Sequence, residues 1–285
     1  QDAVEYNGTT YPVTGIGSGG FQANGYNEVT SISLPATVQS IQQNAFSGCT
    51  KLHTVTFRGN SQLSSIGYRA FYNCDSLKSI TIPASVDTLH VRAFEDCDNL
   101  DTVYFNAAHC EFPGEHDTDG SWYYTPFKHV SLSSIVIGNT VQKLPNHFLM
   151  NTNTCPTLQF ASNSTLEDLG SYAFSSTGYT SITLPASVKT IGFRAFEGCE
   201  QLASVTFDGT PIVETIGIGA FEGCSSLHSF SIPSTVKTIE RYAFKNCGLY
   251  SVTLPVSLEY IDPDIFFGCT SLQTVSFADG IELEY

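Results

Sequence analysis

The sequence predicts a solenoid of the α/β class: a right-handed stack of about 10–11 coils with short parallel strands and short helical turns. Two observations predict it. A motif of the form A-F-x-x-C-x-x-L-x-x-(I/V)-x-(I/L/F) recurs along the chain at intervals of 21 to 33 residues, and repeats of this length are typical of solenoids. Each repeat also holds a segment in which apolar and polar residues alternate, as in a strand with one buried face. The motif phenylalanines are Phe21, Phe46, Phe71, Phe94, Phe127, Phe148, Phe174, Phe196, Phe221, Phe244 and Phe266.

Each coil is expected to hold one strand and one helical turn. In the coil that begins at Phe71, Ile80 and Ile82 alternate with hydroxyl residues, and Pro83 follows at once. Proline cannot donate to a strand ladder, so it ends the strand. Residues 90–97 should then form a helical turn that places an alanine, a phenylalanine and a cysteine inward. One such coil exposes half of its apolar surface, so neighbouring coils must stack to cover it.

Two types of coil alternate along the chain. One type ends in I/L-P-x-(S/T)-V, and the other is longer and ends in phenylalanine, followed by a loop such as residues 58–63. The alternation suggests duplication of a two-coil unit of about 48 residues. The short type occurs at Leu34-Pro35, Ile82-Pro83, Leu184-Pro185, Ile232-Pro233 and Leu254-Pro255, with Ile137-Gly138 in the same slot.

Most cysteines are predicted to be buried thiols. Seven of the nine stand three residues after a motif phenylalanine, and a free cysteine packs as a small apolar side chain. Cys110 and Cys155 lie off the motif, and the sequence leaves open whether they form a disulfide. The seven are Cys49, Cys74, Cys97, Cys199, Cys224, Cys247 and Cys269.

The repeats predict a single solenoid domain over residues 1–285. Residues 16–277 hold the repeats, with an insertion near 106–124. Residues 1–15 read as a hairpin around Asn7-Gly8, the strongest short hairpin signal, and are predicted to cap the first coil. Residues 278–285 form a short acidic end.

Charge and composition exclude some functions. The net charge of −15 disfavours binding to nucleic acid, because an acidic surface repels phosphates. No apolar run reaches the roughly 18 residues that a membrane helix needs. The chain starts at Gln1 and its one methionine is Met150. Removal of a signal peptide is one explanation and would imply a secreted or cell-surface protein; a fragment boundary is the other.

The phrases I-G-F-R-A-F-E-G-C at residues 191–199 and I-T-L-P-A-S-V at 182–188 resemble the Treponema-type leucine-rich repeats of the BspA-like family. The resemblance covers roughly residues 16–277. It implies a leucine-rich-repeat (LRR) solenoid and an exported or surface-attached bacterial protein that binds host matrix or bacterial surface proteins. It implies no catalytic residue and no cofactor.

Two places could bind a partner. The outward strand positions carry mostly Ser and Thr, which suggests either a polar binding surface or hydroxyls that pair with each other across strands. The insertion is the other place, because insertions in repeat proteins often form the binding loops. Trp122 stands five residues before Phe127 and could instead fill a core slot. The candidate partner-binding residues are Tyr104, His109, Glu111, His116, Asp117, Asp119, Trp122, Tyr123 and Tyr124.

No catalytic or metal-binding pattern is evident. The histidines, cysteine and acids of the insertion match no zinc motif, and Asp117-Thr118-Asp119-Gly120 lacks the bidentate glutamate of a calcium loop. The sequence therefore predicts a non-catalytic, adhesin-like binding protein without cofactor or metal, whose partner is a protein or a glycan. A structural spacer that displays another module is the alternative. Deletion of residues 109–121 is expected to abolish binding and to leave stability little changed.

Overall fold

The computed structural model describes residues 3–6, 9–22, 28–116, 122–123, 125–152 and 155–278. Their contacts form two compact units. Unit 1 comprises Gln1–Val141 and Pro156–Asn163, and unit 2 comprises Gln142–Cys155 and Ser164–Tyr285. Each unit is a parallel β-solenoid, and the chain makes about 11 turns in all. The predicted number of coils and their parallel stacking are therefore confirmed, whereas the single domain over 1–285 stays a prediction.

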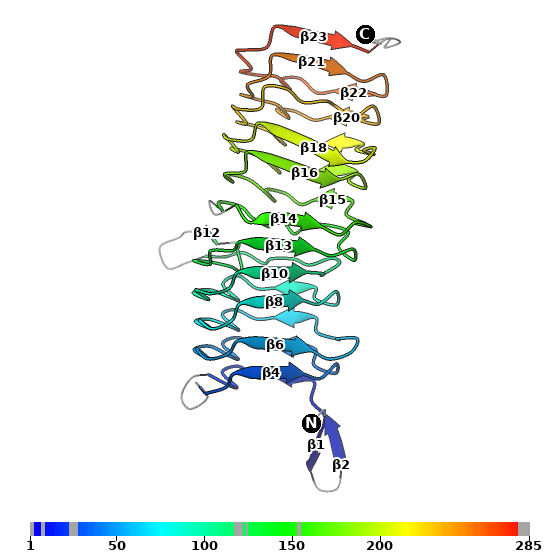
Figure 1. The fold of residues 1–285 in the computed structure, drawn as a ribbon. Coiled ribbons are helices and arrows are strands. Elements are labelled where there is room, and N and C mark those ends of the chain that lie inside the picture. Colours follow the sequence, from blue (N-terminus) through cyan, green and yellow to red (C-terminus); the bar gives the residue numbers. More distant parts are fainter. Residues whose placement is uncertain are drawn as a thin grey trace. The chain divides into compact units, whose positions relative to one another are not determined.

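Unit 1 holds two rows of parallel strands (Figure 1). In the row of longer strands the inward residues are aligned in register, so that Val103 of one coil lies beside Ile80 of the coil before. The longer strands are β4 (Ser31–Leu34), β6 (Thr54–Phe57), β8 (Ser79–Ile82), β10 (Thr102–Phe105), β13 (Ser134–Ile137) and β14 (Thr157–Phe160). The shorter strands are β3 (Gly15–Ile16), β5 (Ser40–Ile41), β7 (Ser65–Ile66) and β9 (Thr88–Leu89).

Unit 2 repeats this arrangement. Its short strands form one continuous parallel ladder, while its longer strands pair two by two. The short strands are β15 (Asp168–Leu169), β17 (Thr190–Ile191), β19 (Thr215–Ile216), β20 (Thr238–Ile239) and β22 (Tyr260–Ile261). The longer strands are β16 (Ser181–Pro185), β18 (Ser204–Asp208), β21 (Ser251–Leu254) and β23 (Thr274–Phe277).

The predicted helical turns are wrong, and with them the α/β class. No helix occurs in the described residues, and none there could cross a membrane. A helix requires a run of right-handed backbone conformations, but most coils place left-handed residues two positions before and two after the motif phenylalanine. In the coil of Phe148 these residues flank Leu149 instead, which holds the phenylalanine slot. Around Phe46 these residues are Asn44, with φ of 55°, and Gly48, with φ of 76°. A left-handed residue every four positions stops a helix from propagating.

The hydrogen bonds of this segment explain why the left-handed residues are tolerated. Successive N–H groups point alternately along their own coil and toward the next one. Ala45 donates to Gln42 in its own coil, and Phe46 donates to Ala70 in the next coil at 2.7 Å. The same alternation continues at Ser47. Every second N–H group therefore ties two coils together, and these bonds offset the roughly 1–2 kcal/mol that a left-handed residue costs.

The motif phenylalanines stack on one another inside each unit. In unit 1 the rings of Phe21, Phe46, Phe71, Phe94 and Phe127 follow at centroid distances of 5.1 to 5.6 Å. In unit 2 those of Phe174, Phe196, Phe221, Phe244 and Phe266 follow at 5.1 to 5.8 Å. Offset stacks of this kind add about 0.5–1.5 kcal/mol per pair beyond burial.

The predicted thiols are confirmed, and each has a hydrogen-bond partner. All seven motif cysteines are free, and all but the half-buried Cys269 are buried. The thiol of each donates to the carbonyl oxygen of the motif phenylalanine in the preceding coil, as Cys224 does to Phe196 at 3.2 Å. In the coil of Phe174 the slot is filled by Thr177, whose hydroxyl lies 3.3 Å from the Cys199 sulfur. The cysteine thus serves both packing and coil-to-coil bonding. Cys110 and Cys155 are free thiols as well.

Proline determines where the row of longer strands is interrupted. In most coils, the residue after the strand donates its N–H to the last strand residue of the preceding coil, as Asn106 does to Ile82 at 3.0 Å. Pro83 holds this position after β8 and has no N–H to offer Phe57. In the described part of unit 1, β6 pairs with β4 and β8 pairs with β10, but no ladder joins β6 to β8.

Unit 2 shows the same effect. Pro233 holds the slot opposite Phe207, and β18 pairs with β16 alone among the described strands. In contrast, Gly138 replaces the proline in unit 1 and donates to Phe105 at 2.9 Å. There the ladder runs on without interruption through β8, β10, β13 and β14.

A hydroxyl two residues after each proline holds the separated coils together. Ser85 donates to the carbonyl oxygen of Leu63 at 2.7 Å, and Thr235 donates to that of Val213 at the same distance. This contact accounts for the S/T of the P-x-(S/T)-V motif: the hydroxyl supplies a coil-to-coil bond close to the place where proline removes one.

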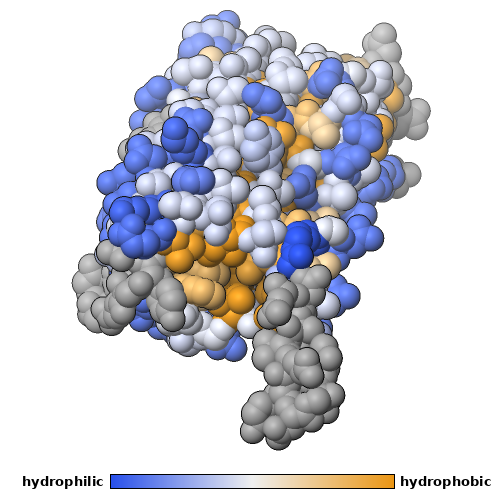
Figure 2. Space-filling model, turned by 60° about the horizontal axis from the view of Figure 1, so that its bottom comes forward, coloured by the Kyte–Doolittle hydropathy of each residue, from blue (hydrophilic) through white to orange (hydrophobic). Residues whose placement is uncertain are grey.

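The amino-terminal hairpin is confirmed. Strands β1 (Ala3–Tyr6) and β2 (Thr9–Pro12) pair antiparallel, with Tyr6 opposite Thr9. Its capping role stays a prediction. Figure 2 shows an apolar patch at this end of unit 1. In the first coil Ile16 and Phe21 are half-buried, although the equivalent Ile41 and Phe46 of the next coil are buried. The acidic end, residues 279–285, lies outside the described residues.

Candidate binding surface

The outward positions of the longer strands are exposed, as predicted, and their hydroxyls bind each other. Thr183 and Thr206 lie on neighbouring strands of unit 2 with their hydroxyl oxygens 3.0 Å apart, and Thr253 and Ser276 are equally close. In unit 1 the Thr56 hydroxyl reaches the carbonyl oxygen of Ile32 at 3.4 Å. These bonds favour the structural explanation for much of the hydroxyl row.

Tyr104 stands out on this surface in unit 1. It belongs to β10, is flanked by Thr81 of β8 and Val136 of β13, and is 43% exposed. It borders a hollow of about 600 Å³ at the amino ends of β8 and β10, which is also lined by Lys78 and Asp101. Hydrogen bonds from Ser133 and Thr102 lower the pKa of Asp101, so this carboxylate stays charged at neutral pH. The hollow thus combines an aromatic ring with a wall that holds two acidic residues, Asp98 and Asp101, and one lysine.

The insertion is narrower than predicted, because the regular coil continues as far as Phe112. Glu111 forms a parallel β-bridge with Thr88 and so extends the ladder of short strands by one coil. The following residue, Phe112, therefore lies beside Leu89. Phe112 is buried with its ring edge-on to Phe105 at 6.3 Å. Phe112 therefore fills the apolar slot for which Trp122 was one candidate.

Beyond Phe112 the chain forms a second small hairpin. Strand β11 (Glu115–His116) pairs antiparallel with β12 (Trp122–Tyr123), and His116 lies opposite Trp122 in the backbone register. The regular coil resumes at Thr125, whose carbonyl oxygen accepts from Arg92 at 3.0 Å. The described part of the inserted segment is thus a pair of short antiparallel strands.

The predicted site residues are only partly brought together. His109 and Glu111 are exposed, but they follow β10 and lie apart from the hollow beside Tyr104. For His116, Trp122 and Tyr123 only the backbone is described, and Asp117, Asp119 and Tyr124 lie outside the described residues.

The chemistry of the described groups does not resemble a catalytic centre. Burial raises the pKa of the Cys110 thiol to about 12, so it is not a ready nucleophile. Glu95, Asp96 and His129 lie close enough to share a metal ion. However, the Glu95 carboxylate is bound by Arg69 at 2.7 Å and Lys128 at 3.4 Å, and the Asp96 carboxylate lies 2.7 Å from Nδ1 of His129. Arg69 and Lys128 thus neutralise Glu95, and the Asp96 carboxylate is already engaged with His129.

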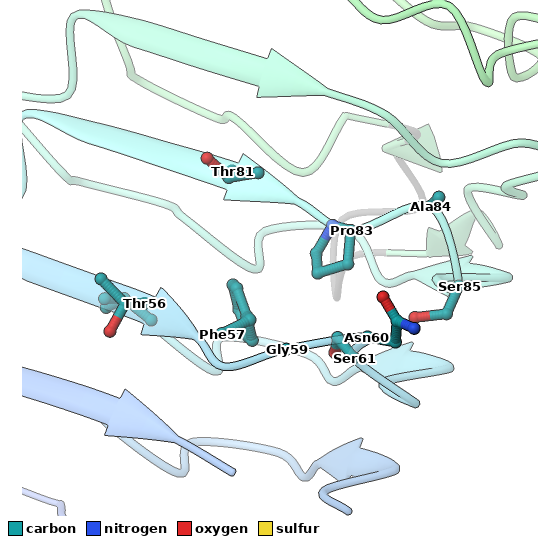
Figure 3. Close-up of a pocket in the computed structure, with 10 residues that line it drawn as sticks. Thr56, Phe57, Gly59, Asn60, Ser61, Thr81, Pro83, Ala84 and Ser85 are labelled. Atoms are coloured by element: carbon teal, nitrogen blue, oxygen red, sulfur yellow. The ribbon is translucent and has the colours of Figure 1, made fainter. Parts of the chain in front are cut away.

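A second hollow, between β6 and β8, was missed in the sequence. It has a volume of about 690 Å³ and is lined by residues from 55–61 and 81–85 (Figure 3). We call it the proline cleft, since Pro83 forms its wall on the β8 side. Part of the signal was present in the sequence: a proline-type coil follows a coil with the longer loop 58–63. The pattern by itself does not predict an opening, because it recurs at Pro233, which is buried.

The comparison with known families decides what kind of protein this is. The family model described as BspA type leucine rich repeat region (6 copies) matches residues 14–114, 123–247 and 209–283. The chain belongs to this family. The resemblance noted in the sequence is thereby confirmed over most of the chain.

Solved structures of bacterial leucine-rich-repeat proteins are similar to this family member. A leucine rich cell surface protein from Faecalibacterium prausnitzii A2-165 shares 24% identity over 98% of this chain and 87% of its own, with a TM-score of 0.44. A leucine-rich repeat protein from Eubacterium ventriosum shares 22% over 95% and 83%, with a TM-score of 0.46. The T. pallidum leucine rich repeat protein shares 25% over 76% and 72%, with a TM-score of 0.32. No curated protein matches the chain.

Proposed function

We propose that this LRR protein is an exported, non-catalytic binding protein that recognises a protein partner through the Tyr104 surface and the insertion. The Tyr104 surface comprises Tyr104, Lys78, Asp98 and Asp101. The observation that carries the proposal is the exposure of Tyr104 in a row whose other outward residues are mostly serine and threonine. Tyrosine is among the residues that contribute most to binding energy at interfaces.

The charge of this surface indicates the chemistry of the partner. Asp98 and Asp101 are both exposed beside the hollow, and the chain as a whole carries −15. An acidic wall around an aromatic ring suits a partner that presents basic side chains. Matrix and bacterial surface proteins with basic patches are the candidates that the family resemblance suggests. Attraction between these charges should weaken as salt is added.

The test compares Tyr104 with a matched tyrosine in unit 2. Tyr250 is 52% exposed and stacks on His228 at 5.0 Å. Immobilised matrix and bacterial surface proteins are screened with the wild type, and any binder is titrated with Tyr104→Ala and Tyr250→Ala. Tyr104→Ala should weaken binding about tenfold or more, whereas Tyr250→Ala should not. Equal losses, or no loss at Tyr104, would contradict the assignment.

A variant without the second hairpin tests the insertion. Residues 115–123 are replaced by a short Gly-Ser linker, which leaves the buried Cys110 and Phe112 in place. Thermal unfolding should change little, and partner binding should fall. A large loss of stability without loss of binding would show that the hairpin supports the fold instead.

A structural spacer is the second candidate. The bond between Thr183 and Thr206, and the matching bond between Thr253 and Ser276, satisfy hydroxyls of the strand surface within the protein. A spacer would show no specific binder in the same screen, and Tyr104→Ala would have no effect on any interaction.

A further inference from the structure

The proline cleft differs from the other breaks in the strand rows in being open to solvent. The ring of Pro83 is half-buried, whereas Pro233, which holds the same slot in unit 2, is buried. Phe57 is half-buried at the opposite side of the opening. Figure 3 shows the Pro83 ring projecting toward the β6 side, with Asn60 and Ser85 at one end of the hollow. The cleft therefore offers two apolar surfaces to a ligand.

The polar groups of the cleft are all neutral. None of the lining side chains is charged. The side-chain groups that can form hydrogen bonds are hydroxyls and one amide. Within the described residues, the Asn60 amide and the Thr81 hydroxyl have no hydrogen-bond partner in the protein, and both residues are exposed. The Ser85 hydroxyl donates to Leu63, and its oxygen can still accept a bond.

These features select the class of ligand. A phosphate, a carboxylate or an ammonium group would lose its hydration without gaining an opposite charge, which is unfavourable. Hydroxyls and an amide both donate and accept, which matches the hydroxyls of a sugar. The apolar C–H face of a sugar ring can lie against Phe57 and Pro83. The volume of about 690 Å³ falls within the roughly 300–1,000 Å³ of small-ligand sites.

We infer that the proline cleft binds a neutral sugar residue of a glycan. The Asn60 amide and the hydroxyls of the cleft bind the sugar hydroxyls, and the sugar ring lies between Phe57 and Pro83. This site is distinct from the Tyr104 surface and does not depend on the proposed function. An extended peptide is the other ligand that unpaired strand edges could attract, and the experiment below separates the two.

The equivalent place in unit 2 provides the control. The loop after Phe207 aligns with that after Phe57, so that Thr210 corresponds to Asn60, and Pro211 and Ile212 replace Ser61 and Gln62. Pro233 is buried there, and Pro211 stands where the open cleft has the Ser61 hydroxyl. A substitution at Thr210 should therefore leave sugar binding unchanged.

The experiment is a glycan array that presents neutral hexose and N-acetylhexosamine oligosaccharides beside sialylated and sulfated ones, together with a set of extended peptides. Neutral glycans that bind the wild type are then titrated by calorimetry with Asn60→Ala and Thr210→Ala. The expected result is binding of neutral glycans only, weakened about tenfold or more by Asn60→Ala and unchanged by Thr210→Ala.

A second variant tests the cleft without removing a polar contact. Pro83→Gly restores an N–H opposite Phe57, as Gly138 does opposite Phe105, and should close the cleft. Sugar binding should be lost, and the new amide should be protected from hydrogen exchange. The inference is overturned if no neutral glycan binds, if only acidic glycans or peptides bind, or if Asn60→Ala binds as tightly as the wild type. If Tyr104→Ala loses binding to the protein partner but still binds the sugar, the Tyr104 surface and the proline cleft are independent sites.

Discussion

The backbone N–H of Gly138 donates to the carbonyl oxygen of Phe105 at 2.9 Å, in the slot that proline fills in every other coil ending in P-x-(S/T)-V. Around this bond the longer strands run on without a break, whereas beside Pro83 they part. One position per coil therefore decides whether neighbouring strands pair.

Substitution of Gly138 by proline should break the ladder between β10 and β13. It removes the bond to Phe105 and leaves that carbonyl without its donor, which costs about 2–3 kcal/mol of unfolding free energy. Urea unfolding measures the loss. Gly138→Ala is the control: its Cβ would meet only the flexible end of the Asn106 side chain, so its loss should be smaller. Equal stability of the proline variant and the wild type would contradict the role of this bond.

The motif thiols should resist alkylation in the folded protein. Cys224 is fully buried, and burial raises its pKa well above the ordinary value of 9.0, so that little thiolate forms. Cys155, which is only half-buried, should react first. Mass spectrometry after brief exposure to iodoacetamide at pH 8 reads the order of labelling. Rapid modification of Cys224 under native conditions would show that the core opens.

Stability should fall as the pH rises above about 9. The folded state holds the thiols protonated, because burial raises the pKa of groups such as Cys199 and Cys224, while thiols of the unfolded chain ionise near 9.0. The unfolded state then binds fewer protons, so the free energy of unfolding decreases with pH. Denaturant unfolding at pH 8, 9 and 10 tests this. A variant with Cys199→Ala and Cys224→Ala should show a shallower decrease, and an equal slope would count against the thiols.

Thr177 should accept replacement by cysteine. It holds the cysteine slot of its coil, is 4% exposed, and its hydroxyl already contacts the Cys199 sulfur. We expect Thr177→Cys to change stability by less than about 1 kcal/mol, whereas Thr177→Leu overpacks the slot and costs about 1–3 kcal/mol. Thermal unfolding of both variants distinguishes these outcomes. Equal destabilisation by both would show that the slot is specific for a hydroxyl.

The repeat carries most of the information about the fold. Alternation around Ile80 predicts the strand, and the regular place of Cys224 predicts a buried thiol, because both depend on residues that face one shared core. The helical turns were wrong, since a spacing of three and four residues between inward side chains also fits a chain that alternates right- and left-handed residues. Gly48 and Asn73, two residues after their phenylalanines, were the available sign, as these residue types adopt positive φ most readily.

The candidate site was harder to predict. Counting back from Phe127 left open a core slot for Trp122, but Phe112 fills that slot, because the ladder continues at Glu111. The proposed deletion of residues 109–121 would also remove Cys110 and Phe112, which are buried, and so would test packing instead of binding. The proline cleft depends on the absence of a backbone hydrogen bond between position 83 and Phe57. A pattern of side chains does not predict such an absence directly.

The prolines also have a consequence for how such a chain can change its length. The duplicated unit consists of a proline-type coil and the longer coil after it, and the long strands pair within that unit, as β16 does with β18. Beside Pro83 and Pro233 the unit boundary carries no long-strand ladder among the described residues. Gain or loss of a whole two-coil unit at such a boundary would leave those ladders intact. Recombination between repeats can therefore change the number of coils while each long strand keeps the neighbouring strand with which it already pairs.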